Sequence, residues 1–155
     1  MILLFNFDKF GMYEQSCIFC KIVRKEISTN FITENDQALA FLDAYPLAVG
    51  HTLIIPKTHY SKINEMNKAC SVGLFDLLWK ITEPLERSLN VNSSTIAIHN
   101  GREAGQEIPH VHIHVIPRTY GDGGGPIHSL FKKNRPHLDS NTMRQIVDKI
   151  KENMK

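Results

Sequence analysis

Residues 110–116 of the chain alternate imidazole with aliphatic side chains. In a β-strand, side chains at positions i, i+2 and i+4 point to one face of the sheet. The three histidines, His110, His112 and His114, would therefore share one surface, and the aliphatic residues between them would face the buried side. The segment predicts a half-buried strand that presents a row of titratable groups.

Such a row of histidines can serve two kinds of chemistry. Two imidazoles at i and i+2 can share a metal ion, because imidazole is a common metal ligand. Alternatively, a neutral imidazole nitrogen can attack phosphorus and carry the transferred group as a covalent intermediate. A metal-dependent hydrolase that uses all three histidines is disfavoured, because the outer Cα atoms would lie about 13 Å apart on a straight strand.

The residues around the row resemble the signature of the histidine triad (HIT) superfamily. In that signature a Gly-Gln pair precedes the pattern His-φ-His-φ-His-φ-φ, where φ is an apolar residue. Here Gly105 and Gln106 take the place of the pair. Further matching segments are 17–22, 40–43, 50–59 and 100–101. The resemblance covers Cys17 to Arg118 and is greatest to the Hint-like and prokaryotic-type nucleotide hydrolases.

The resemblance implies an α+β fold with a five-stranded antiparallel sheet, one long helix and a C-terminal helix. Relatives form homodimers with one continuous sheet, so a homodimer is expected. Local patterns predict matching elements. They are a hairpin of 31–33 and 38–42, strands over 51–56 and 95–99, a helix over 67–90 and a final helix capped by Asp139 or Ser140. Residues 1–15 are predicted to be an N-terminal extension, and residues 16–155 a single HIT domain.

Cys17 and Cys20 form a C-x-x-C pair at the start of the matching region. By itself the pair is compatible with two buried thiols, a redox dithiol or half of a zinc site, because structural zinc needs four ligands. The resemblance adds His59 and His110, which complete the set in zinc-bearing relatives; His51 is an alternative to His59. A closed Cys2His2 set implies a structural zinc that the chemical step does not require.

The resemblance also implies a site for a purine nucleotide. Asp43 would accept hydrogen bonds from the ribose hydroxyls, because a carboxylate is a double acceptor. Apolar side chains would sandwich the base, although an ordinary core position is an equal reading for Ile22 and Leu42. The base-contacting residues would be Ile18, Phe19, Ile22 and Leu42, and those around the phosphate Asn100, Gly105, Gln106, His112 and His114.

The predicted reaction is hydrolysis or transfer of a nucleoside monophosphoryl group at the α-phosphate. His112 would be the nucleophile, which requires an unprotonated Nε2 and a backbone carbonyl that accepts from Nδ1–H. Water would then release the nucleotide from the nucleotidyl-histidine. Gln106, nearby backbone amides and His114 would donate hydrogen bonds to the phosphate oxygens. His51 would support the row by hydrogen bonding.

Two positions bear on the subtype of the reaction. His114 occupies a position that is typically Gln in the transferase and phosphorylase branches, which favours a hydrolase of the phosphoramidate or dinucleoside polyphosphate type. Glu107 stands where several Hint-like proteins carry Ser, which disfavours a serine-assisted proton relay. The alternative function is a nucleotide- and zinc-binding regulatory scaffold with little catalysis. His99, which precedes Asn100 at the end of a predicted strand, is a further candidate for the site, although a satisfied strand-end histidine is the favoured interpretation.

Composition argues against other classes of partner. The net charge is +2 and the basic run at 132–135 is short, so a nucleic-acid partner is not expected. The apolar start of the chain is too short to span a bilayer and lacks the features of a signal peptide, so no membrane association is expected. The odd number of cysteines, three, favours a reduced, cytoplasmic location.

Overall fold

The computed structural model describes residues 14–131 and 136–154. The predicted N-terminal extension of residues 1–15 therefore lies almost wholly outside the described residues. Contacts within the chain divide it into two compact units, Met1–Asp122 and Gly123–Lys155. The sheet and its two helices belong to the first unit, and the C-terminal helix belongs to the second. That residues 16–155 form a single domain stays a prediction.

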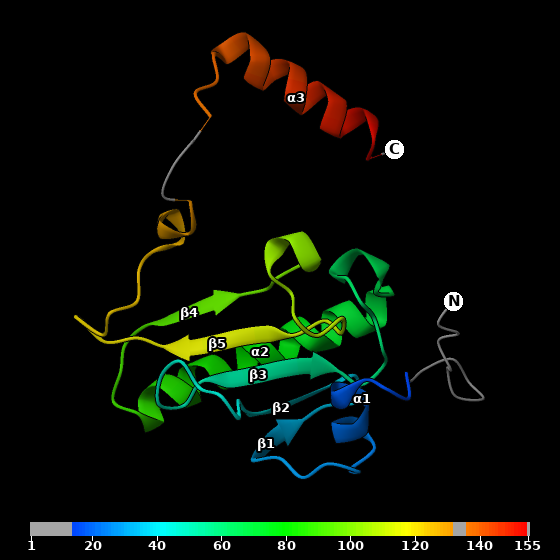
Figure 1. Ribbon diagram of the computed structural model, residues 1–155, viewed down its shortest axis with the longest axis vertical. Helices are drawn as coiled ribbons and strands as arrows, with labels where there is room; N and C mark the ends of the chain where they lie inside the picture. Colours follow the sequence, from blue (N-terminus) through cyan, green and yellow to red (C-terminus); the bar gives the residue numbers. More distant parts are fainter. Residues whose placement is uncertain (1–13, 132–135, 155) are drawn as a thin grey trace. The chain divides into compact units, whose positions relative to one another are not determined.

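The first unit is built on a five-stranded antiparallel sheet with the strand order β1-β2-β3-β5-β4 (Figure 1). The strands are β1 Phe31–Glu34, β2 Ala38–Leu42, β3 Thr52–Pro56, β4 Ser94–Ala97 and β5 Ile113–Pro117. The hairpin of β1 and β2 closes at Asn35, whose Oδ1 accepts hydrogen bonds from the backbone N–H groups of Gln37 and Ala38. The predicted α+β fold is confirmed.

The described residues form three α-helices: α1 Ile18–Val23 and α2 Lys68–Ser88 in the first unit, and α3 Ser140–Glu152 in the second. Single 3-10 turns lie at η1 Ile63–Glu65, η2 Arg102–Ala104 and η3 Ile127–Leu130. Asn67 caps α2 by accepting from the Cys70 N–H, and Asp139 caps α3 by accepting from the Thr142 N–H. No helix within the described ranges is both long and apolar enough to cross a lipid bilayer.

The two faces of the sheet are covered by different helices (Figure 1). On one face α2 packs on the aliphatic residues of β3 and β5 and of the segment before β5; this core comprises Ala38, Ala40, Ile54, Leu74, Leu77, Ile81, Val111, Ile113 and Val115. On the other face α1 packs on a second cluster, which comprises Cys17, Phe19, Cys20, Leu39, Phe41, Leu53 and Ile55. Side chains alternate along a strand, so the histidines lie on the α1 face.

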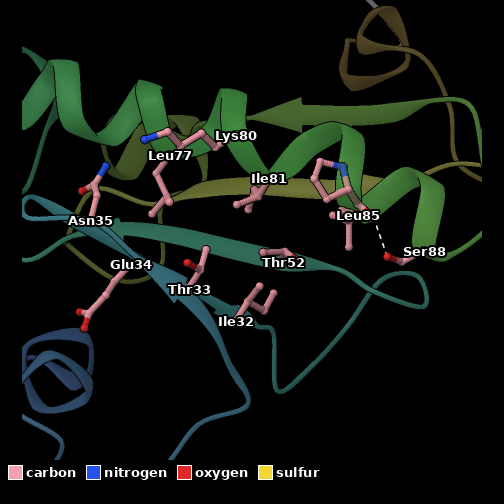
Figure 2. Close-up of a pocket in the computed structure, with 11 residues that line it drawn as sticks. Ile32, Thr33, Glu34, Asn35, Thr52, Leu77, Lys80, Ile81, Leu85 and Ser88 are labelled. Carbon is pink, nitrogen blue, oxygen red and sulfur yellow. Dashed lines mark hydrogen bonds between the residues drawn. The ribbon is translucent and has the colours of Figure 1, made fainter.

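A hollow of about 630 Å³ lies on the α2 side of the sheet (Figure 2). It is bordered by residues of β1, by Thr52 of β3 and by the α2 residues from Leu77 to Ser88. None of the described histidines lines it. The hollow is therefore separate from the histidine cluster on the opposite face.

Candidate active site and metal centre

The histidine segment differs from the predicted strand at its beginning. β5 starts at Ile113, so the prediction of a strand from His110 is wrong for the first three residues. The reason is that the Val111 N–H donates to the Tyr60 carbonyl at 2.7 Å, outside the strand pairing. This contact ties the start of the segment to the loop after β3. The alternation of the side chains between the two faces nevertheless persists.

The donor atoms of Cys17, Cys20, His59 and His110 lie within 4.8 Å of one another. Nδ1 of His110 lies 3.4 Å from Sγ of Cys17 and 3.6 Å from Sγ of Cys20, and Nδ1 of His59 lies 3.3 Å from Sγ of Cys20. Tetrahedral zinc with ordinary bond lengths separates its sulfur and nitrogen ligands by about 3.5 Å. The four side chains therefore fit a tetrahedral Cys2His2 zinc site.

The surroundings of this group also suit a metal. Nε2 of His110 donates to the Pro56 carbonyl at 3.0 Å, which leaves the Nδ1 lone pair facing the thiols. The Glu14 N–H donates to Sγ of Cys20 at 3.4 Å. The Cys20 thiol, followed by His110 and His59, lowers the pKa of Cys17, whereas Cys17 raises the pKa of Cys20. A thiolate is the form that binds zinc.

His112 is held in one tautomer. Its Nδ1 lies 2.7 Å from the backbone oxygen of His110, and because a carbonyl only accepts, Nδ1 must carry the proton. Nε2 of the neutral ring then has a free lone pair. Burial is the largest cause that lowers the pKa of His112 below its usual value, which favours this neutral form. The hydrogen bond to a backbone carbonyl that was predicted for His112 Nδ1 is present, whereas its role as the nucleophile stays a prediction.

A second chain of hydrogen bonds sets the tautomer of His114. The backbone N–H of Leu47 donates to Nδ1 of His51 at 3.1 Å, so the proton of neutral His51 lies on Nε2. That Nε2 lies 2.9 Å from Nδ1 of His114, which must accept. His114 therefore carries its own proton on Nε2. His51 thus lies against His114 and not among the cysteines.

Burial lowers the pKa values of both His51 and His114. For His51, desolvation is the main cause, and the nearby carboxylate of Asp43, with Oδ2 3.5 Å from His51 Nδ1, acts in the opposite direction. For His114, desolvation and then the neighbouring His112 and His51 lower the pKa to about 4. Both rings are consequently neutral near pH 7, as the hydrogen bonds require.

Together these hydrogen bonds give His112 and His114 complementary ring nitrogens, one an acceptor and one a donor. The ring centroids of His112 and His114 lie 4.9 Å apart. One ring offers an unprotonated Nε2 and the other an Nε2–H. Phe19 packs edge-on against His112, with centroids 5.3 Å apart, and restricts its ring. A nucleophile beside a hydrogen-bond donor is suited to attack on a phosphoryl group.

The loop before the triad is held by the side chains of Gln106 and Asn100. Gln106 Oε1 accepts from the Gly101 N–H at 2.8 Å, and its Nε2 donates to the Ser61 carbonyl at 2.9 Å. Asn100 Oδ1 accepts from the Ile63 N–H at 2.8 Å. The structure therefore shows both amides as organisers of the loop, a role for Gln106 that the motif alone did not indicate because its partner Ser61 lies far away in sequence.

Glycine is required at two positions of the same loop. Gly101 and Gly105 have φ angles of +112° and +92°, which disfavour any residue with a Cβ atom. They bracket the turn of η2 and return the chain to the start of the triad segment. The predicted phosphate-side residue Gly105 thus has a conformational reason for being glycine.

The residues predicted to bind the nucleoside lie on the α1 side of the site. Ile18 is 44% exposed, whereas Phe19 is buried against Phe41 and His112. Ile22 and Leu42 are half-buried. Asp43 follows β2, and its Oδ1 accepts from the Tyr45 N–H at 2.9 Å.

Comparison with known proteins agrees with this geometry. The HIT domain family matches residues 24–121. An uncharacterized HIT-like protein of Methanocaldococcus jannaschii is 44% identical over 107 residues, which are 69% of this chain and 82% of the relative. The adenosine 5'-monophosphoramidase of Schizosaccharomyces pombe is 38% identical, over 71% and 82% of the two chains. The adenylylsulfatase of Arabidopsis thaliana is 37% identical, over 70% of this chain and 55% of the relative.

Solved structures give the same result. A Streptococcus mutans protein superposes with a TM-score of 0.84 at 28% identity and covers 100% of this chain and 96% of its own. A histidine triad nucleotide-binding protein of Candida albicans has a TM-score of 0.77 at 30% identity, with coverage of 90% and 97%. A zinc-bound histidine triad family protein of Mycobacterium smegmatis has a TM-score of 0.66 at 29% identity, with coverage of 89% and 97%.

The sheet, the loop and the alternating histidines define a histidine triad domain. The chain belongs to the HIT family. At the level of the family, relatives named as an adenylylsulfatase and an adenosine monophosphoramidase support a nucleotide hydrolase.

Proposed function

We propose that this protein cleaves nucleoside monophosphoryl conjugates through a nucleotidyl-histidine formed on His112. The observation that carries the proposal is the hydrogen bond from His112 Nδ1 to the His110 carbonyl, because it leaves a lone pair on Nε2 of a neutral, buried ring. An imidazole in this state is a competent nucleophile toward phosphorus.

The reaction proceeds in two displacements at the α-phosphorus. In the first, a bond forms between His112 Nε2 and phosphorus, and the bond to the leaving group breaks with its electron pair. In the second, water attacks phosphorus and gives up a proton to the solvent, the P–N bond breaks with its electron pair returning to Nε2, and the nucleoside monophosphate is released. His114 donates from Nε2–H to a phosphoryl oxygen, and His51 keeps that proton in place. The second amide hydrogen of Gln106 supplies a further donor, whereas the backbone N–H groups of Gly105 and Gln106 already donate to carbonyls of the same loop.

The nucleoside binds beside α1 in this proposal. Asp43 accepts from the ribose hydroxyls, since its Oδ2 makes only a long contact with His51. The apolar side chains of Ile18, Phe19, Ile22 and Leu42 border the base. A purine is expected because the two relatives named for their reactions act on adenosine 5'-phosphoryl compounds.

Zinc has a structural role in this proposal. Cys17, Cys20, His59 and His110 would hold it, and all four ligand positions would be occupied by protein. Bound zinc would tie α1 to the segment before β5. The chemical step uses His112 and His114, neither of which belongs to the ligand set.

A homodimer is also proposed. β4 is an edge strand with one unpaired side, and its Ile96 is 47% exposed. Trp79 of α2 is 78% exposed, which is unusual for a large aromatic side chain. A second copy that pairs along β4 would extend the sheet. Light scattering of the purified protein, with a variant that places proline at Ile96, tests this assembly.

The function is tested with His112→Ala and a panel of adenosine phosphoramidate, diadenosine polyphosphate and adenylyl sulfate. We expect the unchanged protein to cleave at least one of them and His112→Ala to lose about 10³-fold or more in kcat. A radiolabelled adenylyl group should remain bound to the unchanged protein after rapid acid-free denaturation. His137→Ala, an exposed histidine of the second unit, is the matched control.

The alternative, a regulatory nucleotide- and zinc-binding scaffold, makes the opposite prediction. In that case the zinc-loaded protein would bind adenosine monophosphate but cleave no member of the panel. His112→Ala would then retain the same cellular effect as the unchanged protein. That pair of results would remove the catalytic proposal.

A further inference from the structure

One imidazole near the site has no role in the mechanism described above. β4 pairs with β5 so that Ala97 lies opposite His114. His99 lies two residues past the end of β4, and alternation places its side chain on the face that Ala97 shares with His114. The ring centroid of His99 lies 5.9 Å from that of His114, at an interplanar angle of 52°. His99, predicted to be an ordinary strand-end residue, therefore borders the histidine cluster.

The surroundings of His99 leave its ring nitrogens available. The residue is half-buried, and a Cβ atom at Gly105 would lie 3.7 Å from its Nδ1, so the loop before the triad passes close to the ring. Among residues 14–131 and 136–154, the ring found stacked near His99 is that of His114, without a hydrogen bond, and His99 also interacts electrostatically with His112. A neutral imidazole always carries one N–H donor. Water can accept from this donor in the free protein, because the residue is only half-buried, and a bound substrate can take the place of that water.

His99 lies on the side of the cluster away from the nucleoside. Asp43 and His51 approach His114 from the β2 and β3 side, where the Asp43 N–H donates to the His51 carbonyl at 2.8 Å. β4 lies on the other side of β5. If phosphorus sits over His112 and the nucleoside extends toward Asp43, the rest of the substrate lies over β5 and β4. His99 is then the side chain that this part of the substrate meets.

We propose that His99 contacts the leaving group and favours substrates whose leaving group is an oxyanion. The substrate class is a nucleoside monophosphate joined through an anhydride oxygen to a phosphate, polyphosphate or sulfate group. As His112 Nε2 bonds to phosphorus, the P–O bond breaks and its electron pair stays on the departing oxygen. The His99 N–H donates a hydrogen bond to that growing charge without transferring its proton. This inference rests on the function proposed above.

The chemistry of the leaving group explains why the contact discriminates. A departing phosphate or sulfate has several acceptor oxygens and gains negative charge, so a donor stabilises it more as the bond breaks. An amine leaving group gains no oxyanion and needs a proton in place of a hydrogen bond. The contact therefore speeds anhydride cleavage more than phosphoramidate cleavage.

The test compares His99→Leu, which removes the donor, with His99→Gln, which retains an N–H at similar reach. We expect His99→Leu to lower kcat/KM for adenylyl sulfate and diadenosine polyphosphate by about 10-fold to 100-fold, as for loss of a hydrogen bond to a charged group. Turnover of adenosine phosphoramidate should change by less than about 3-fold, within the scatter of a neutral substitution. His99→Gln should recover most of the loss, and His137→Leu should change neither rate.

The ratio of the two activities separates this inference from the proposed function and from a structural role. Equal losses on anhydride and phosphoramidate, or no loss on either, would overturn the inference while the proposed function stands. Failure of His99→Gln to recover activity, with unchanged zinc content and thermal midpoint, would also overturn it. An unchanged protein that cleaves no substrate would overturn the proposed function first, and the two failures are therefore distinguishable.

Discussion

At the scale of single residues, backbone groups decide which nitrogen of each histidine carries the proton. The Leu47 amide determines the tautomer of His51, and His51 in turn determines the tautomer of His114. The His110 carbonyl determines the tautomer of His112, independently of the other two rings. Because backbone groups do not titrate, these assignments hold as long as the loops keep their positions. In the proposed reaction, His112 and His114 are therefore prepared before any substrate arrives, which lowers the cost of organising the site.

The lowered pKa values of His51 and His114 predict that the folded chain loses stability in mild acid. Below the ordinary histidine pKa of about 6.5, the unfolded chain takes up protons that the folded chain excludes, so the free energy of unfolding decreases. For His114 this loss continues until the pH reaches about 4, the pKa of the folded state. Calorimetry from about pH 7.5 to about pH 4.5 should show a falling midpoint, since this interval spans the ordinary histidine pKa.

A variant isolates the contribution of His114 to this loss. His114→Gln removes one titrating group but keeps an amide that can accept from His51. Its midpoint should fall less steeply with pH than that of the unchanged protein. Release of zinc in acid affects both proteins alike, so it cancels in the comparison. Equal slopes would show that His114 is not buried as a neutral ring.

At the scale of elements, the Cys2His2 group joins α1 to two other parts of the first unit. α1 has only six residues, too few for a helix to persist by its own hydrogen bonds. Its Phe19 packs against both His110 and His112. A metal bound to this group would therefore stabilise the helix whose Phe19 restricts His112, the proposed nucleophile. Zinc would affect the reaction by holding α1 in place, and it would take no part in the chemical step.

Removal of zinc is therefore predicted to destabilise the protein more than it changes the chemistry. Cys20→Ser should bind less than one zinc per chain and unfold at a lower temperature, because the buried set loses a thiolate ligand. Metal analysis and calorimetry measure both effects. Cys70→Ser is the matched control, since Cys70 is buried on α2 and its Sγ donates to Gln37, a bond that serine can replace. Equal zinc content in the two variants would contradict the assignment.

At the scale of the whole molecule, the residues that stabilise the first unit and the residues of the candidate site lie on opposite faces of its sheet. The α2 face holds an aliphatic core, whereas the α1 face holds the histidines and the thiols. The alternation of side chains along β5 connects the two faces, because Ile113 and Val115 pack in the core and anchor the strand that carries His114. A change in the core on the α2 face should therefore act on folding and leave the reactive groups in place.

Leu77→Ala tests this separation. Leu77 is 2% exposed, and truncation of a buried leucine costs about 2–5 kcal/mol of unfolding free energy. We expect a lower midpoint in urea but an unchanged kcat at temperatures where the variant is folded. Phe75→Ala, at a 41% exposed position on the same helix, is the control and should change the midpoint little. A large fall in kcat of folded Leu77→Ala would show that the two faces are coupled.

Much of the fold and part of the site could be predicted from local sequence. Alternation at 110–116 indicated which residues face the core, helical spacing predicted the helix over 67–90, and Asp139 or Ser140 was predicted to cap the last helix, where the structure shows Asp139. Both signals depend on residues within a few positions of one another, where backbone geometry limits the possible contacts. The motif resemblance then predicted the five-stranded antiparallel sheet, but not the order of its strands, and the four residues of the candidate metal group.

Other features depended on contacts between distant parts of the chain. Cys17 meets His110 across 93 positions, and Gln106 meets Ser61 across 45. The start of β5 moved because Val111 bonds to Tyr60, and the position of His99 became visible only once β4 paired with β5. The sequence by itself determined which side chains are available and which face each one takes. Only the tertiary structure decided which of them meet, because long-range packing selects partners that no local pattern encodes.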